Sequence, residues 1–252
     1  MFRKGETVSA YISYGGGRNS TAMTILILTD DRFADLRDGL RIVFADTGAE
    51  MPETICYVNY FSNWLKREHD ITIETVSAGN LIEYCEKHRM VPSRMYRWCT
   101  RIFKVQPLEA FAKKNGCTLS LIGFDAGEAH RSESNNFAHK ANRRFPLIEA
   151  NIDLAGCIKI IQDAGLEVPK KSGCWCCPFA RKAHFEDLRT YKPDLWERAL
   201  ALEENADCFQ QKIYLKDKPL REWLQNPGLE LDEPCAVCEL MNEKEKEVGS
   251  DG

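Results

Sequence analysis

Hydrophobic and polar positions follow two different periods along the first half of the chain. Short apolar runs typical of buried strands alternate with segments in which apolar residues recur every three or four positions, as on one face of a helix. The pattern predicts strands at Val8–Tyr14, Arg41–Ala45, Ile71–Val76 and Leu119–Gly123, and helices at about Ser20–Leu28, Thr54–Glu68, Leu81–Lys87 and Pro107–Lys114. Strands that alternate with helices indicate an α/β fold with a doubly wound, Rossmann-like parallel sheet.

The pattern becomes helical after about residue 150. Helices are predicted at Leu154–Ala164, Lys182–Leu188, Leu195–Asn205 and Leu220–Leu224. We therefore expect a nucleotide-binding domain over residues 1–150 and a helical, cysteine-rich region over residues 151–244 that packs on it. The acidic tail, residues 245–252, is expected to be disordered.

Composition excludes several classes of protein. With 252 residues, 44% of them hydrophobic and 29% charged, the chain is unlike a low-complexity or collagen-like scaffold. Its longest apolar run, Thr21 to Leu28, is too short to span a bilayer. The first residues contain no apolar secretion signal. We expect a cytoplasmic protein that has no membrane partner.

Charge is distributed unevenly around the net value of −4. Residues 230–252 hold eight acids and two lysines, a net −6, which leaves +2 for the rest of the chain. Residues 89–104 contain no acid and five basic residues: Arg89, Arg94, Arg97, Arg101 and Lys104. Lys140, Arg143 and Arg144 form a second basic group. Such patches favour phosphate or sulfate binding, and the first could also meet a nucleic-acid backbone. Solvated basic helix faces are the alternative.

A run of glycines links the first predicted strand to the first helix, in Tyr11-Ile-Ser-Tyr-Gly-Gly-Gly-Arg-Asn-Ser-Thr-Ala22. Glycines allow the backbone to approach a ligand closely, and the free N–H groups of a helix's first turn bind anions. The carboxyl end of the first strand is also where open parallel sheets bind nucleotides. The run fits neither the Walker pattern nor Gly-x-Gly-x-x-Gly. We predict a phosphate-binding loop, with a purely structural turn as the alternative.

This loop resembles the pyrophosphate loop, Ser-Gly-Gly-x-Asp-Ser, of the adenine nucleotide alpha-hydrolase superfamily. Gly15 replaces the usual Ser, and Asn19 replaces the usual Asp, which keeps a hydrogen-bonding side chain but loses a charge. The resemblance implies a Rossmann-like fold that binds ATP or an adenylylated sulfate, with magnesium as a further candidate ligand. The nucleotide-binding residues that it implies here are Ser13, Gly15, Gly16, Gly17, Asn19 and Ser20.

Four later segments, in the same order, are similar to segments of phosphoadenylyl-sulfate (PAPS) reductases. They are Phe44–Thr54, Trp98–Pro107, Ile122–Arg131 and Phe145–Ile148, the last matching the family's Pro-Leu strand. The likeness runs from residue 8 to about residue 205. It implies nucleotide-binding roles for Asp46, Thr47, Gly123, Asp125, Glu128 and Arg131, and catalytic roles at a phosphate or sulfonate for Arg101 and Lys104.

Eleven cysteines form the second chemical signal. Cys174-Trp-Cys-Cys177 and Cys235-Ala-Val-Cys238 are two Cys-x-x-Cys pairs, and two such pairs make the four-sulfur set of a structural zinc or an iron–sulfur cluster. Spacing alone favours a shared site of these four. Cys56, Cys85, Cys117 and Cys208 are interpreted as small buried hydrophobic residues.

The segment Ser172-Gly-Cys-Trp-Cys-Cys-Pro-Phe179 resembles the Ser-Gly-Cys-x-x-Cys-Pro element of PAPS-reductase-like proteins, including many from phages. Adenylyl-sulfate reductases and the sulfurtransferases of DNA phosphorothioation hold a [4Fe–4S] cluster through a similar pair and upstream cysteines. The resemblance therefore implies Cys174 and Cys177 as ligands. The other ligands come from Cys99, Cys157, Cys235 and Cys238. Cys176 is a spare thiol or a sulfur carrier.

Three functions remain open on these grounds. The first is ATP-dependent sulfur transfer to an acceptor, either a nucleic acid or a small molecule, with a protein sulfur donor as a further expected partner. The second is reduction of adenylyl-sulfate or PAPS to sulfite, although the Glu-Cys-Gly-x-His tail of assimilatory reductases is absent here. The third is a non-enzymatic nucleotide-binding module that contains a structural zinc.

Overall fold

Five parallel strands form one sheet, in the order β3-β2-β1-β4-β5. The computed structural model describes residues 9–94, 96–133, 142–206 and 219–223. The strands are β1 (Ala10–Tyr14), β2 (Arg41–Ala45), β3 (Ile73–Val76), β4 (Leu119–Leu121) and β5 (Arg143–Arg144). This sheet confirms the predicted α/β, Rossmann-like architecture.

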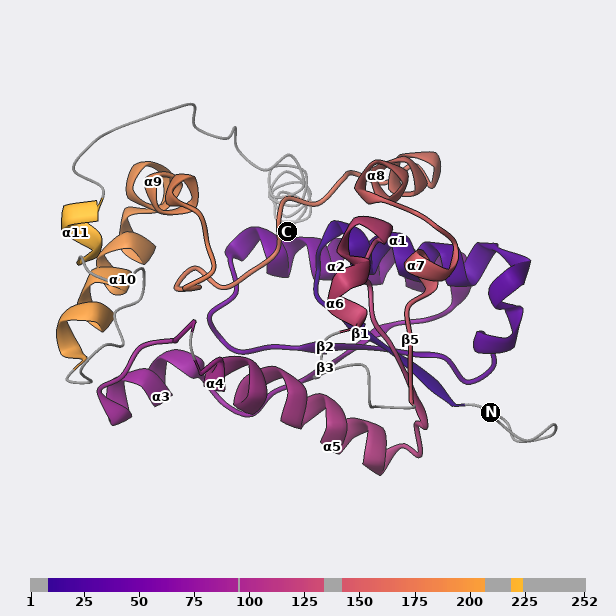
Figure 1. Ribbon diagram of the computed structural model, residues 1–252, viewed down its shortest axis with the longest axis horizontal. Coiled ribbons are helices and arrows are strands. Elements are labelled where there is room, and N and C mark those ends of the chain that lie inside the picture. The colour runs from indigo at the N-terminus through magenta and orange to yellow at the C-terminus, as the bar shows by residue number, and fades with distance from the viewer. Residues whose placement is uncertain (1–8, 95, 134–141, 207–218, 224–252) are drawn as a thin grey trace, which may run out of the picture.

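Helices cover both faces of the sheet, as Figure 1 shows. The α-helices are α1 (Arg18–Thr29), α2 (Pro52–His69), α3 (Leu81–His88), α4 (Trp98–Thr100), α5 (Gln106–Lys114), α6 (Ala129–Ser132), α7 (Pro146–Glu149), α8 (Leu154–Asp163), α9 (Lys182–Tyr191), α10 (Pro193–Asn205) and α11 (Leu220–Trp223). Three tighter or wider helical turns are η1 (Asp31–Leu36), η2 (Arg101–Val105) and η3 (Ala126–Glu128). None of the helices in the described ranges is long and apolar enough to cross a membrane.

The alternation of side chains along the strands divides the core between the two faces of the sheet. Ile12 and Phe44 point to the face that α1, α2 and α8 cover. Tyr11 and Val43 point to the opposite face, where they pack with Leu108 of α5. Because both faces are covered, the strands are apolar almost throughout, as expected for a parallel sheet.

The helices beyond residue 150 belong to two different apolar clusters. Helix α8 packs against α1 and contributes Cys157 and Ile161 to the main core. Helices α9 and α10 instead pack with α3 around Trp175. In Figure 1, α9, α10 and α11 therefore lie at the opposite end of the molecule from α7.

One predicted strand is wrong. Pro146 and Leu147 open the helical turn α7, and the strand beside β4 is the preceding pair Arg143–Arg144. Proline is favoured at the first position of a helix because its missing N–H would have no helical partner there. The Glu149 carboxylate also accepts a hydrogen bond from the Phe145 N–H at 3.3 Å, which closes the turn.

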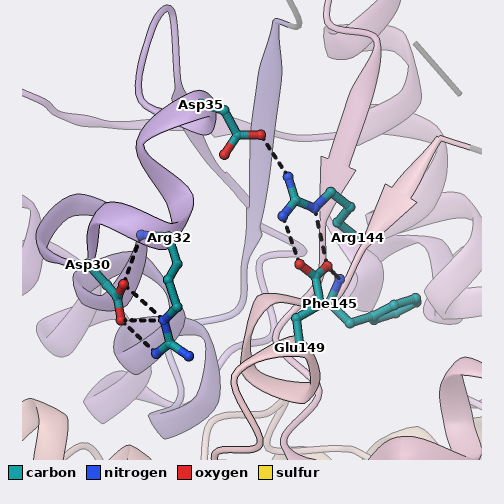
Figure 2. Close-up of polar contacts among 6 residues, drawn as sticks. All are labelled: Asp30, Arg32, Asp35, Arg144, Phe145 and Glu149. Atoms are coloured by element: carbon teal, nitrogen blue, oxygen red, sulfur yellow. Dashed lines mark hydrogen bonds and ion pairs between the residues drawn. The ribbon is translucent and has the colours of Figure 1, made fainter.

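Arg144 fixes the edge of the sheet to its surroundings, as Figure 2 shows. Its guanidinium pairs with Asp35 of η1 at 3.0 Å and with Glu149 of α7 at 2.7 Å. The hydrogen bond from Arg144 to Glu149 outweighs desolvation and raises the pKa of the guanidinium. Arg144 therefore has a structural role within the second basic group, and Lys140 of that group lies outside the described residues.

Replacing Arg144 by methionine should destabilise the protein by about 1 kcal/mol, because two ion pairs that connect separate elements are lost. Urea unfolding of wild type and variant at low salt measures this difference. Arg32→Met is the matched control, since the ion pair of Arg32 joins it to Asp30, two residues away, and its side chain is more exposed. An equal loss of stability in the two variants would contradict the structural role of Arg144.

Candidate functional site

The glycine loop lies where the direction of strand order changes. Strand β1 lies between β2 and β4, and the loop leaves its carboxyl end, where parallel sheets commonly bind ligands. Gly16 has φ +68°, and a Cβ there would lie 2.9 Å from Thr54 Cγ2 and 3.1 Å from Val58 Cγ2. The Ser20 hydroxyl accepts from the N–H groups of Gly15 and Gly17, each at 3.3 Å. Glycine at position 16 and Ser20 therefore hold the loop in a tight turn on helix α2.

Asn19 is held by two carboxylates. Its Nδ2 donates to Asp125 Oδ2 at 2.9 Å and to Glu128 Oε2 at 3.0 Å. An aspartate at this position would face two like charges, which disfavours ionisation. The asparagine that departs from the pyrophosphate-loop pattern is thus matched to the acids around it.

Two further predicted nucleotide residues lie at the same place. A Cβ on Gly123 would be 3.1 Å from backbone atoms of Asn19 and Ser20, so this glycine allows β4 to approach the start of α1. Arg131 forms an ion pair with Glu128 and lies 4.1 Å from the ring centroid of Phe124. The segments after β1 and β4 therefore form one polar edge.

The loop after β2 provides the other side of the site. Ser13 of β1 is half-buried and pairs in register with Val43 of β2. Asp46 is half-buried, and its Oδ1 accepts from the Gly48 N–H at 2.8 Å. The buried Thr47 hydroxyl donates to Glu50 Oε2 at 2.7 Å.

The cysteine segment reaches this edge through an antiparallel backbone contact. The Met51 N–H donates to the Gly173 carbonyl and the Trp175 N–H donates to the Ala49 carbonyl, both at 2.9 Å. Immediately before this contact the chain passes the glycine loop, because a Cβ on Gly17 would lie 2.7 Å from Ser172 Oγ. Cys174 is therefore placed between the glycine loop and the β2 loop.

Polar groups surround the Cys174 thiol. Its Sγ is 3.6 Å from Thr47 Oγ1 and 3.8 Å from Glu50 Oε1. Lys104 Nζ in turn pairs with Glu50 Oε1 at 3.3 Å, and the Glu50 side chain is only 1% exposed. Burial raises the pKa of Cys174 to about 12, although the nearby Lys104 charge opposes this shift. Without a bound metal, Cys174 is a neutral thiol at pH 7.

The ion pair between Lys104 and the buried Glu50 changes the acidities of both partners. Burial alone would raise the pKa of Glu50, but the Lys104 charge and the Thr47 hydrogen bonds outweigh it and the pKa is lowered. Burial alone would likewise lower the pKa of Lys104, but neighbouring Cys174 and Glu50 raise it. Both side chains are therefore charged at neutral pH.

A π-helical turn follows Cys99 and contains Lys104. Between α4 and α5, η2 is hydrogen-bonded from residue i to i+5, as in the bond from the Gln106 N–H to the Arg101 carbonyl. Such turns are frequent at functional sites. Cys99 interacts electrostatically with Cys177 and with Lys104, and burial is the main cause of its raised pKa. Arg101, at the start of η2, is exposed.

The other cysteines divide into separate groups. Cys176 is fully buried, and burial raises its pKa well above the usual value. Its role as a spare thiol or a sulfur carrier stays a prediction. Cys157 is fully buried in the main core near Asp125 and Asp153, on a different element from the Cys174 segment. Cys235 and Cys238 lie outside the described residues. Within the described ranges, no three Cys, His, Asp or Glu side chains are grouped closely enough to hold a metal ion.

Sequence reasoning missed two residues of this site. Glu50 follows Asp46 and Thr47 in the segment after a buried strand, and its place beside these two candidate residues was a usable signal. Ser172 has no comparable signal, because its approach to Gly17 depends on the path of the chain after α8.

Comparison with known families and proteins identifies a family match. Residues 9–151 match the family model described as the phosphoadenosine phosphosulfate reductase domain. An uncharacterized protein of Methanocaldococcus jannaschii is 26% identical over 241 residues, which cover 89% of this chain and 54% of that protein. A second uncharacterized protein of the same organism is 26% identical over 201 residues, 74% of this chain and 40% of that protein. The chain thus spans about half or less of these curated relatives.

Two solved structures are similar in fold. The U34-tRNA thiolase NcsA from Methanococcus maripaludis, solved with its [4Fe–4S] cluster, has a TM-score of 0.50 and 15% identity, covering 92% of this chain and 80% of that one. The phosphoadenylyl-sulfate reductase from Candida auris, in a phosphate complex, has a TM-score of 0.45 and 15% identity, covering 66% and 81%. At this identity the likeness to NcsA concerns the fold alone.

Gly16→Ala should destabilise the protein by about 2 kcal/mol, because it combines a left-handed backbone with contacts to Thr54 and Val58 that are too close. Gly39→Ala is the matched control, since Gly39 has φ +65° but nothing within 4 Å of its added Cβ. The control should lose only about 1 kcal/mol. Thermal and urea unfolding measure both, and equal losses would show that the loop does not pack tightly on α2.

Glu50→Gln should cost about 2 kcal/mol at pH 7, because the buried carboxylate that pairs with Lys104 and accepts the Thr47 hydrogen bonds loses its charge. Since the pKa of Glu50 is lowered on folding, the stability from its charge is present above about pH 4.3 and disappears as the pH falls through the lower folded-state pKa. The difference between wild type and variant should therefore shrink below about pH 4. Glu74→Gln, which breaks a half-exposed pair with Arg41, serves as the control and should show a smaller loss.

Proposed function

Because the chain belongs to the phosphoadenosine phosphosulfate reductase domain family, we propose that it is an enzyme that transfers sulfur to an acceptor. In this proposal ATP binds at the glycine loop, and a [4Fe–4S] cluster is held by Cys99, Cys174 and Cys177. The observation that carries this proposal is the contact between the cysteine segment and the two nucleotide loops. Cys174 lies beside Thr47 and Glu50, and Ser172 lies against Gly17.

The glycine loop supports nucleotide binding through its backbone. Gly15, Gly16 and Gly17 precede the first turn of α1, where free N–H groups and the helix dipole favour a phosphate. Asp125 and Glu128 supply the hard oxygen ligands that the magnesium ion of a nucleotide prefers. Asp46, which follows the carboxyl end of β2, would meet the ribose or base.

The cysteines support a sulfur-ligated cluster through their chemistry. Thiolates are the usual protein ligands of iron–sulfur clusters. Cys99, Cys174 and Cys177 interact electrostatically with Lys104 or with one another, whereas Cys157 does not share these neighbours. A bound metal would deprotonate these thiols despite their burial. Cys235 or Cys238 would supply a fourth ligand.

The proposed reaction has two steps. An acceptor oxygen attacks the α-phosphorus of ATP, and the bond to the leaving pyrophosphate breaks. Hydrosulfide from a sulfide donor then attacks the activated carbon, a C–S bond forms, and the C–O bond breaks to release AMP. The cluster, when bound, would present sulfide as a soft nucleophile next to the nucleotide.

The chain's own residues would stabilise charge in these steps. Lys104, held by Glu50, is a fixed cation beside Cys174, and Arg131 is a second cation beside the glycine loop. Such preorganised charges lower the barrier when negative charge develops on phosphate oxygens. Arg101, exposed at the start of η2, would act on the part of the substrate nearer the solvent.

The cluster is tested by anaerobic purification followed by iron and sulfide analysis. We expect about four iron atoms per chain in wild type. Each of the variants Cys99→Ser, Cys174→Ser and Cys177→Ser should lose most of this iron. Cys117→Ser is the matched control, because Cys117 packs beside α5, and it should keep the iron. A colourless protein that contains one zinc ion per chain would contradict the cluster and favour the zinc module.

The reaction is tested with ATP, sulfide and candidate acceptors. Pyrophosphate and AMP should form together only when an acceptor is present, and Lys104→Met should lower the rate at least tenfold, as for other fixed charges at reacting phosphates. If PAPS and a thiol donor instead give sulfite without any need for ATP, the reductase is the correct function.

A further inference from the structure

Two stretches of the chain are rich in basic residues and contain no acid, although the whole chain has a net charge of −4. Residues 87–108 carry Lys87, Arg89, Arg94, Arg97, Arg101 and Lys104. Residues 168–185, which include the cysteine segment, carry Lys170, Lys171, Arg181 and Lys182. Positive charge is therefore concentrated around the cysteines of an otherwise acidic protein, which indicates a polyanionic partner.

The structure joins these two stretches at Phe179. The guanidinium groups of Arg94 and Arg97 lie over its ring, at 5.2 and 5.1 Å from the centroid. Cation–π contacts of this kind hold arginines in place while leaving their N–H groups available to a ligand. Beneath them, Trp98 of the first stretch and Ala180 of the second pack against the same apolar cluster.

Exposed aromatic rings lie among these arginines. Tyr96 is 67% exposed and Phe179 is 43% exposed. Tyr96 lies between Arg94 and Arg97 in the sequence, and Phe179 follows Cys177 by two residues. We call Arg94, Tyr96, Arg97, Arg101 and Phe179 the arginine–aromatic surface.

Aromatic and basic side chains together fit one class of partner better than others. A small anion, or the phosphates of a bound nucleotide, needs the charges but not exposed rings. Unpaired bases stack on tyrosine, phenylalanine and arginine planes, while the phosphates that connect them pair with arginines. Duplex bases are stacked on one another and are not available for such contacts.

We propose that the arginine–aromatic surface binds a single-stranded polynucleotide and brings one of its bases to the cysteine site. That the bound strand is the sulfur acceptor rests on the proposed function. The binding itself rests only on the charges and rings of this surface. Since Phe179 is two residues from Cys177, a strand held on the ring would pass beside the cysteines.

Binding is tested by fluorescence anisotropy of a labelled 15-nucleotide oligouridine, with oligodeoxythymidine and a 15-base-pair duplex as further arms. Wild type should bind either or both single strands at least tenfold more tightly than the duplex. Tyr96→Ala should weaken binding about tenfold, and Tyr96→Phe should restore it, because the ring and not the hydroxyl stacks. Tyr191→Ala is the matched control on another exposed tyrosine and should have no effect.

The charges are tested by salt dependence. Arg94→Gln combined with Arg97→Gln should reduce the slope of log affinity against log salt by about 1.4, since each phosphate contact on a single strand contributes about 0.7. Lys66→Gln combined with Arg67→Gln, which removes two exposed charges from the end of α2, should leave the slope unchanged. Glutamine at position 97 keeps a side chain of similar reach at a left-handed backbone position.

Equal affinity for duplex and single strands would overturn the proposal, and so would an equal loss of affinity in Tyr191→Ala and Tyr96→Ala. Competition by polyglutamate that is as effective as competition by unlabelled oligouridine would also overturn it. That last result would assign the surface to an acidic protein segment. The assay needs neither ATP turnover nor the cluster. If the protein binds single strands but contains no iron and releases no pyrophosphate, only the proposed reaction is rejected. If it contains iron and releases pyrophosphate but does not bind single strands, only this surface is rejected.

Discussion

The backbone contact between Ala49–Met51 and Gly173–Trp175 is the interaction on which the candidate site depends. Two hydrogen bonds of 2.9 Å join segments that are more than a hundred residues apart in the sequence. They are buried among apolar side chains, where an unpaired backbone group would cost about 1–3 kcal/mol. Because this contact fixes the position of Cys174, it also determines which polar groups surround its thiol. Together with the approach of Ser172 to Gly17, it brings the cysteine segment to the glycine loop and the β2 loop.

Charge within the site is arranged in two parts with different partners. Around the glycine loop, an uncharged amide meets the carboxylates of Asp125 and Glu128, which leaves oxygen ligands for a cation. Beside the thiol of Cys174, the half-exposed Lys104 pairs with the buried Glu50. Under the proposed function, a hard cation with its phosphates and a soft sulfur-ligated group would occupy neighbouring positions without competing for the same side chains.

Much of the fold could be predicted from local pattern. Strand β2 was predicted to the residue, because both of its faces are buried and its apolar run is continuous. The Pro146 turn was expected to be a strand because its segment resembles the family's Pro-Leu strand, and the carboxylate that closes the turn comes from outside that segment. The position of the glycine loop after β1 was predicted from the sequence. Cys99 was one of four candidates to join Cys174 and Cys177, because cysteine spacing contains no information on which distant segments the core brings together.

The π-turn between α4 and α5 has a consequence for how this region tolerates changes in length. Its hydrogen bonds join residues five apart, whereas those of an α-helix join residues four apart. In a regular α-helix, residues five apart differ by about 140° around the axis. Removing one residue between Cys99 and Lys104 would therefore change the direction in which the lysine leaves the helix relative to the cysteine. The length of this segment, and not only its composition, sets where Lys104 meets Glu50.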